Sequence, residues 1–154
     1  MQQAEAKCER LLAARERSSV EIYQRLVKDG YSVDIAQAMV ERLVQSGIVD
    51  DERFCRLYIQ SKQNQGWGMR RITYQLSLLG IKADQFIELF DSFSDDTDEL
   101  ARATDALSRY RGRSKDAYAG RYRYLSSRGF KSSVITQVLR TWRDESDPND
   151  FTQT

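Results

Sequence analysis

The strongest constraint on the fold of this 154-residue chain is a short segment that occurs three times. Each copy has a leucine, three residues, a glycine and a large apolar residue, and the copies span 26–31, 76–81 and 125–130, at offsets of 50 and 49. A glycine at a helix end allows the positive φ that reverses the chain, and the following apolar residue packs back on the last turn. A fixed period of this kind predicts a helical unit repeated in tandem.

The residues after each glycine support the repeat. At the same offsets, apolar residues align with apolar residues except at Gln85, which aligns with Ile35 and Val134. The aligned sets are Ala36, Phe86 and Ile135; Met39, Leu89 and Val138; Val40, Phe90 and Leu139; and Leu43, Phe93 and Trp142. Spacings of three and four residues, and a single proline at Pro148, favour helices over strands.

We therefore expect an all-α protein with three three-helix repeats at 1–49, 50–94 and 95–143, followed by a polar, disordered tail at 144–154. The expected helices are 4–15, 18–29, 32–46, 50–64, 68–79, 82–93, 97–111, 115–128 and 132–143. Ser18 and Glu21 have the spacing of a capping box, and Asp96 with Glu99 resembles one.

The composition excludes most catalytic chemistry. The chain has no histidine, which removes the commonest general base and zinc ligand. Cys8 and Cys55 lack a metal-site spacing, so we expect two buried thiols. The acidic stretch 94–99 lacks the central glycine and distant glutamate of an EF-hand and is predicted to be a solvated linker. We expect no catalytic residues, no metal and no cofactor.

No uncharged run is long enough to cross a bilayer, and the N-terminal residues lack the apolar core of a signal peptide. We therefore expect a cytoplasmic protein that does not bind membranes.

Charge is distributed unevenly. Residues 84–105 carry eight acids and one base, a net −7, and residues 109–131 carry eight bases and one acid, a net +7. Helical spacing places Arg121, Tyr124 and Arg128 on one face, which we expect to be exposed. The candidate partner-binding residues are Arg70, Arg71, Arg109, Arg111, Arg113, Lys115, Arg121, Arg123, Tyr124, Arg128 and Lys131. Such a basic face suits phosphates, exposed bases or an acidic protein groove, and a merely solvated face is the alternative.

Between Cys8 and Trp142, the chain resembles the RecX family of recombinase regulators. The most specific stretch is Gly-Ile-Val-Asp-Asp-Glu-Arg-Phe at 47–54. Further matches lie at 17–22 with Leu26 and Gly30, at Gly66 with Arg71-Ile72, Leu76 and Gly80-Ile81, and at 123–130.

The resemblance implies a curved, elongated, monomeric protein of DNA repair and the SOS response. Such a protein binds the groove of a RecA filament on DNA and inhibits ATP hydrolysis and strand exchange. Capping of filament ends, groove binding and displacement of protomers all remain open, as does direct contact with single- or double-stranded DNA.

Two other classes remain. A DNA-binding module made of helix-turn-helix units would show salt-sensitive DNA affinity without any recombinase. An enzyme that uses carboxylates and a metal ion finds no supporting set of residues.

Overall fold

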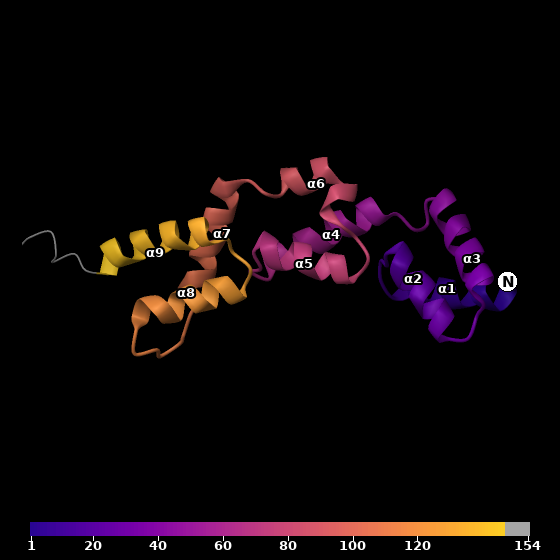
Figure 1. Ribbon diagram of the computed structural model, residues 1–154, viewed down its shortest axis with the longest axis horizontal. Coiled ribbons are helices and arrows are strands. Elements are labelled where there is room, and N and C mark those ends of the chain that lie inside the picture. The colour runs from indigo at the N-terminus through magenta and orange to yellow at the C-terminus, as the bar shows by residue number, and fades with distance from the viewer. Residues whose placement is uncertain (147–154) are drawn as a thin grey trace, which may run out of the picture. The chain divides into compact units, whose positions relative to one another are not determined.

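A computed structural model describes residues 1–146, and every regular element in this range is a helix. The elements are α1 (Gln2–Ala14), α2 (Ser19–Lys28), α3 (Val33–Gln45), α4 (Asp51–Asn64), α5 (Met69–Leu78), the 3-10 helix η1 (Ala83–Gln85), α6 (Ile87–Ser92), α7 (Asp96–Ser108), α8 (Ala117–Ser127) and α9 (Ser132–Ser146) (Figure 1). The predicted all-α fold class is confirmed.

The three repeated glycines end helices as expected. Gly30, Gly80 and Gly129 have φ values of 98°, 86° and 96°. After each one, the backbone N–H of the large apolar residue donates to the carbonyl of the repeated leucine, at 3.0 to 3.2 Å. This bond satisfies a carbonyl that the helix end leaves free and directs the apolar side chain inward. Gly47 and Gly66 adopt positive φ as well, which the repeat did not indicate.

The chain forms two compact units. One consists of Met1–Tyr58 with Gln75–Leu89, and the other of Ile59–Tyr74 with the residues from Phe90 onward. The helices α4 and α5, which belong to the middle repeat along the chain, are therefore each divided between the two units.

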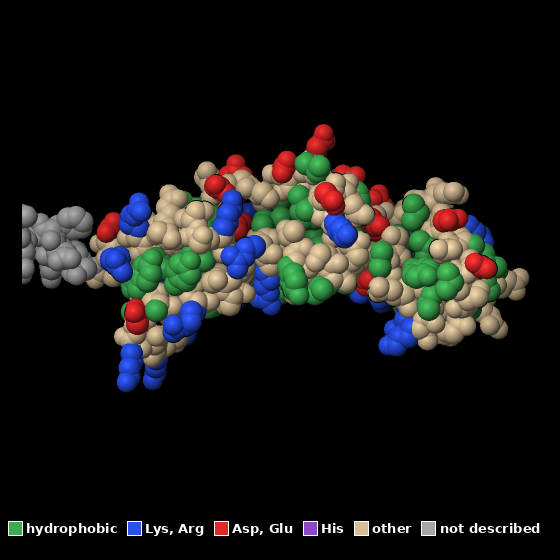
Figure 2. Space-filling model, viewed as in Figure 1, with side chains coloured by type: hydrophobic (Ala, Val, Ile, Leu, Met, Phe, Trp, Pro, Cys, Tyr) green, Lys and Arg blue, Asp and Glu red, His purple; other side chains and the backbone are tan. Residues whose placement is uncertain are grey.

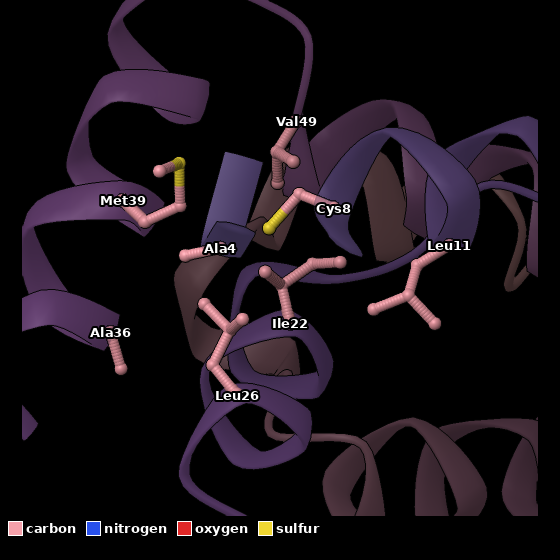
Figure 3. Close-up of a cluster of buried hydrophobic side chains, with 8 residues drawn as sticks. All are labelled: Ala4, Cys8, Leu11, Ile22, Leu26, Ala36, Met39 and Val49. Atoms are coloured by element: carbon pink, nitrogen blue, oxygen red, sulfur yellow. The ribbon is translucent and has the colours of Figure 1, made fainter. Parts of the chain in front are cut away.

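The core of the first unit comes from helical spacing on α1, α2 and α3. Ala4, Cys8 and Leu11 lie on one face of α1 and pack against apolar residues of the other two helices and of the loop before α4 (Figure 3). The full cluster is Ala4, Cys8, Leu11, Ile22, Leu26, Ala36, Met39 and Val49. Both cysteines are buried free thiols, as expected.

The core of the second unit lies among α7, α8 and α9, which pack against one another (Figure 1). The buried residues are Ala103, Ala106, Leu125, Phe130, Val134, Ile135, Val138 and Leu139. Phe130, the apolar residue after the third repeated glycine, is fully buried in this cluster, so the turn also supplies a core side chain.

Two sequence expectations about helix ends are corrected. The helix expected at 82–93 is broken at Phe86, whose φ of −137° and ψ of 57° are not helical. The side chain of Gln85 accepts a hydrogen bond from the N–H of Lys82 instead of filling the apolar position of the repeat. The N-cap of α7 is Asp95 and not Asp96, since the Asp95 carboxylate accepts from the N–H groups of Thr97 and Asp98.

The capping box of Ser18 and Glu21 is present. Helix α9 continues to Ser146, beyond the boundary expected at 143, and the remaining tail residues, 147–154, lie outside the described part of the chain. Within residues 1–146, no helix combines the length and apolar character that a membrane span requires.

Candidate partner-binding surface

The loop between α7 and α8, residues 109–116, is here called the basic loop, and it folds around the ring of Tyr110. That ring packs on Tyr124 with centroids 5.1 Å apart. A Cβ on Gly112 would lie 2.1 Å from the Tyr110 hydroxyl oxygen, and one on Gly120 would lie 2.6 Å from it. A side chain at either glycine would therefore displace the Tyr110 ring from its place in the loop.

The basic loop presents its cations outward. The side chains of Arg111, Arg113 and Lys115 are exposed, as is Arg123 on the adjoining helix. Arg111 donates to the carbonyls of Ser108 and Tyr110, both at 3.1 Å, whereas Arg113 and Lys115 have no side-chain hydrogen bond or ion pair within residues 1–146. Figure 2 shows Lys and Arg side chains gathered on this loop. An exposed cation without an intramolecular partner is free to contact a phosphate or carboxylate.

The predicted exposure of Arg121, Tyr124 and Arg128 is wrong, because all three are half-buried. The guanidinium carbon of Arg121 lies 4.3 Å from the ring centroid of Trp142 and 5.1 Å from that of Tyr110. A cation over an aromatic face contributes about 0.5–2 kcal/mol. Arg121 therefore joins α8 to α9 and to the basic loop.

Arg128 also makes internal contacts. It donates to the carbonyl of Gln65 at 3.1 Å, and its guanidinium carbon lies 5.1 Å from the ring centroid of Tyr124. These contacts connect the end of α8 to the turn between α4 and α5, within the same unit. Arg128 therefore has a structural use that its helical spacing did not reveal.

The second candidate group, at the start of α5, is organised by Trp67. Arg71 stacks on the Trp67 ring, with its guanidinium carbon 3.7 Å from the centroid, and Lys62 lies over the ring at 4.6 Å. Arg70 is exposed and has no ion pair within the described range. The structure thus separates the two arginines, because Arg71 covers an aromatic ring and Arg70 faces solvent.

Two arginines at a helix N-terminus oppose the helix dipole, and the structure shows what offsets this cost. The N–H groups of Gly68 and Arg70 donate to the carbonyls of Arg128 and Gly129, at 2.8 and 3.1 Å. The N–H of Met69 donates to the carboxylate of Glu99 at 3.2 Å. The start of α5 therefore meets the negative end of α8 and a buried acid.

Sequence reasoning considered Glu99 only as a helix-capping residue, yet it is 2% exposed. Burial raises the pKa of Glu99 above its ordinary value, and the hydrogen bond from Met69 and the charge of Arg102 partly oppose this rise. The local sequence does not distinguish Glu99 from Asp96 and Asp98, two acids on the same helix that are exposed. Its burial could therefore not be predicted from the sequence.

The remaining predicted cations pair with nearby acids. Lys131 forms an ion pair with Asp96, and Arg109 forms one with Asp105 at 2.9 Å. The basic and acidic segments therefore neutralise one another locally at these two points. Within the described residues, no group of three or more acids or thiols could hold a metal ion.

Comparison with known proteins gives consistent matches. Residues 4–43 match the family model described as "RecX, first three-helix domain", and residues 50–85 match "RecX, second three-helix domain". The Regulatory protein RecX of Chromobacterium violaceum is 32% identical over 143 residues, which cover 91% of each chain. The protein of the same name from Mycolicibacterium vanbaalenii is 43% identical over 81 residues, which cover 52% of this chain.

The chain spans about half the length of the mycobacterial relatives it matches, 44% of that protein and 49% of the one from Mycobacterium avium. Among solved structures, RecX from Lactobacillus salivarius matches with a TM-score of 0.73 and 16% identity, covering 91% of this chain and 94% of that one. This likeness shows a common fold.

Proposed function

The chain belongs to the RecX family, and from this premise we propose that it is a non-enzymatic, cytoplasmic regulator that binds a RecA filament on DNA and inhibits ATP hydrolysis and strand exchange. Its relatives are named regulatory proteins, which supports a role in binding and not in turnover. Without histidine, the chain lacks the commonest catalytic base. A protein that binds a filament can shift the equilibrium between its active and inactive states by binding alone, without any chemical step.

The observation that carries the proposal is the basic loop. Arg113 and Lys115 are exposed cations that no residue within 1–146 pairs with, on a loop whose Tyr110 ring packs on Tyr124. A preformed loop loses little conformational entropy on binding, so more of the attraction between charges remains as affinity. Arg70, Arg111 and Arg123 are the other exposed bases of this unit that we assign to the contact.

The half-buried residues have a different role in this proposal. Arg71, Arg121, Tyr124 and Arg128 hold the surface in shape through their ring and backbone contacts. Arg109 and Lys131 are paired with acids and contribute less.

The test measures ATP hydrolysis by RecA on single-stranded DNA as the protein is added. We expect the wild type to inhibit, and the double variant Arg113→Glu/Lys115→Glu to require at least about tenfold more protein, since each lost phosphate or carboxylate contact costs roughly 1–3 kcal/mol. The matched control is Arg10→Glu/Lys28→Glu, which reverses two exposed charges in the other unit. Absence of inhibition by the wild type would refute the function, and equal inhibition by both double variants would refute the assignment to the loop.

The amount of protein needed also distinguishes the modes of binding. Inhibition at amounts far below one molecule per filament protomer supports capping of filament ends, whereas inhibition that grows in proportion to coverage supports binding along the groove.

The same unpaired cations favour a second candidate function, direct DNA binding without a recombinase. Fluorescence anisotropy with single- and double-stranded DNA tests this function. If the basic loop contacts phosphates, the affinity for DNA falls as salt is raised. The slope of log K against log[salt] should then be smaller by roughly 2 in the double variant, about 1 for each phosphate contact that is lost. DNA binding that persists in the double variant would place the contact elsewhere.

A further inference from the structure

Helix α5 has one buried side and one exposed side. Ile72 and Leu76 are 0% exposed, whereas Tyr74 and Leu78 are 60% and 59% exposed. Tyr74 and Leu78 lie one turn apart on the same side of the helix, opposite the buried pair. Figure 2 shows hydrophobic side chains at the surface over α5. Two large apolar side chains are therefore in contact with water on one side of this helix.

Arg70 extends the exposed side toward the start of the helix. It is exposed and lies one turn before Tyr74, so Arg70, Tyr74 and Leu78 form a row, here called the α5 face. At 1.5 Å per residue, the row is about 12 Å long. All three residues belong to one helix, so their spacing is set by α5 alone.

The segment that contains the α5 face carries only positive charge. Residues 53–83 contain six bases and no acid. Four of these bases already have partners, two in ion pairs with acids outside the segment and two over the Trp67 ring. The other two, Arg70 and Lys82, are exposed and form no ion pair within residues 1–146. The charge on the α5 face is therefore an unpaired cation, which is complementary to a carboxylate or a phosphate.

The two apolar side chains decide between these anions. A nucleic acid supplies phosphates for Arg70 and a base that stacks on Tyr74, but removing Leu78 from water requires an apolar side chain at the far end of the row. We propose that the α5 face binds an acidic segment of a protein partner. Large apolar side chains of that segment cover Tyr74 and Leu78, and its carboxylate accepts from Arg70. Only the identity of the partner as the recombinase rests on the proposed function.

The first test uses a blocked peptide with the sequence glutamate-serine-leucine-serine-leucine as the probe. Alternate side chains of an extended peptide point the same way, about 6.6 Å apart, which is close to the spacing of about 6 Å along the row. The reporter is the Leu78 methyl signal in protein labelled with ¹³C at the leucine methyls, and the buried Leu26 is the internal control. The peptide is expected to shift Leu78 saturably and to leave Leu26 unchanged.

Three comparison ligands test the chemistry. One peptide has lysine in place of glutamate, another has serine in place of both leucines, and the third ligand is single-stranded oligothymidylate. All three are expected to bind several-fold more weakly than the first peptide. Equal or tighter binding of either comparison peptide, or no saturable shift at Leu78 with the first peptide, would overturn the proposal. Tighter binding of oligothymidylate at Leu78 would assign the α5 face to nucleic acid instead.

Two variants locate the peptide on the face. Tyr74→Ser is expected to weaken binding of the first peptide, and Arg70→Gln to remove the preference for glutamate over lysine. The matched control is Val44→Ser, at an exposed apolar position on α3, which is expected to bind the peptide as the wild type does. Substitutions at exposed positions change stability little, so circular dichroism is expected to show all three variants folded. Equal binding by Tyr74→Ser and Val44→Ser would place the peptide elsewhere and refute the assignment.

The second test links the α5 face to the recombinase. In the RecA ATP hydrolysis assay, Tyr74→Ser/Leu78→Ser is expected to need several-fold more protein for inhibition than the control Val27→Ser/Val44→Ser, which removes two exposed apolar side chains from other helices. If the wild type inhibits and the two double variants are equal, the recombinase is refuted as the partner of this face, while the proposed function stands. If the wild type does not inhibit, the proposed function fails and the peptide result still decides the chemistry of the face.

Discussion

Gly68 is expected to be one of the most sensitive positions of the second unit, although its φ is not positive and it is not one of the three repeated glycines. A Cβ added there would lie 2.4 Å from the carbonyl oxygen of Gly129 and 2.6 Å from the backbone nitrogen of Phe130. These are backbone atoms, which cannot rotate away as a side chain can. Gly68→Ala must therefore push the start of α5 about 1 Å away from the end of α8.

The size of the effect follows from the hydrogen bonds at this contact. The N–H groups of Gly68, Met69 and Arg70 donate to Arg128, Glu99 and Gly129, at 2.8, 3.2 and 3.1 Å. Each bond contributes about 0.5–1.5 kcal/mol, and a buried group left without a partner costs about 1–3 kcal/mol. Weakening all three bonds should reduce the free energy of unfolding by roughly 3 kcal/mol, which lowers the urea midpoint by about 1–3 M at an m-value of about 1–3 kcal/mol per M.

Tryptophan fluorescence during urea unfolding measures this change. Both tryptophans of the chain, Trp67 and Trp142, lie in the second unit, so the signal reports that unit. The matched control is Gly30→Ala in the first unit, where nothing lies within 4 Å of the added Cβ and the cost is the positive φ alone, about 1–2 kcal/mol.

We expect Gly68→Ala to move the tryptophan transition and Gly30→Ala to leave it nearly unchanged. An unaltered midpoint for Gly68→Ala, with the variant folded by circular dichroism, would refute the close contact between the start of α5 and the end of α8.

Three further predictions concern individual side chains. Arg121→Glu should lower the melting temperature by about 3–8 °C in circular dichroism, because the stacking on two aromatic rings is lost; the exposed Arg140→Glu is the control, and equal melting would show that Arg121 is not structural. Glu99→Gln should be more stable than the wild type near neutral pH in urea unfolding. Burial raises the folded-state pKa of Glu99, so the stability gained from its protonation is complete below the ordinary value of 4.5 and is lost as pH rises through the folded-state value. The difference in free energy of unfolding between Glu99→Gln and the wild type should therefore shrink as pH falls. A difference that stays constant with pH would contradict this. Burial raises the pKa of Cys55 to about 12, so its thiol should react with a disulfide reagent only as fast as the protein unfolds, and rapid labelling of the native protein would exclude its burial.

Much of the fold could be read from the sequence because its signals are local. The glycine turns at 30, 80 and 129, and the capping box of Ser18 and Glu21, involve residues close together along the chain. Their geometry depends on φ preferences and on hydrogen bonds within one or two turns, which any copy of the segment carries. The same locality explains why the helices lie close to the expected ranges.

The break at Phe86 had a weaker local signal. Gln85 was the polar exception among aligned apolar positions, and it is where the 3-10 helix ends before α6 begins. A departure from the repeat pattern therefore indicated a departure from the repeat structure, although the pattern alone did not show which form it would take.

The candidate surface depended on tertiary structure. Helical spacing placed Arg121, Tyr124 and Arg128 on one face, but spacing does not show which other elements contact that face. In the structure, Arg121 of this face lies over the rings of Trp142 on α9 and Tyr110 in the basic loop. Arg128 of the same face donates to the carbonyl of Gln65 in the α4–α5 turn.

Glu99 and the exposed loop cations show the same limit. An acid becomes buried, or a base stays free, according to whether a helix from elsewhere in the chain reaches it, and the start of α5 reaches Glu99 while none of the described residues pairs with Arg113. The sequence by itself determined where the chain turns and which residues are charged. The tertiary structure decided which of those charges hold the fold and which remain free to bind, because exposure depends on contacts between residues far apart in the chain.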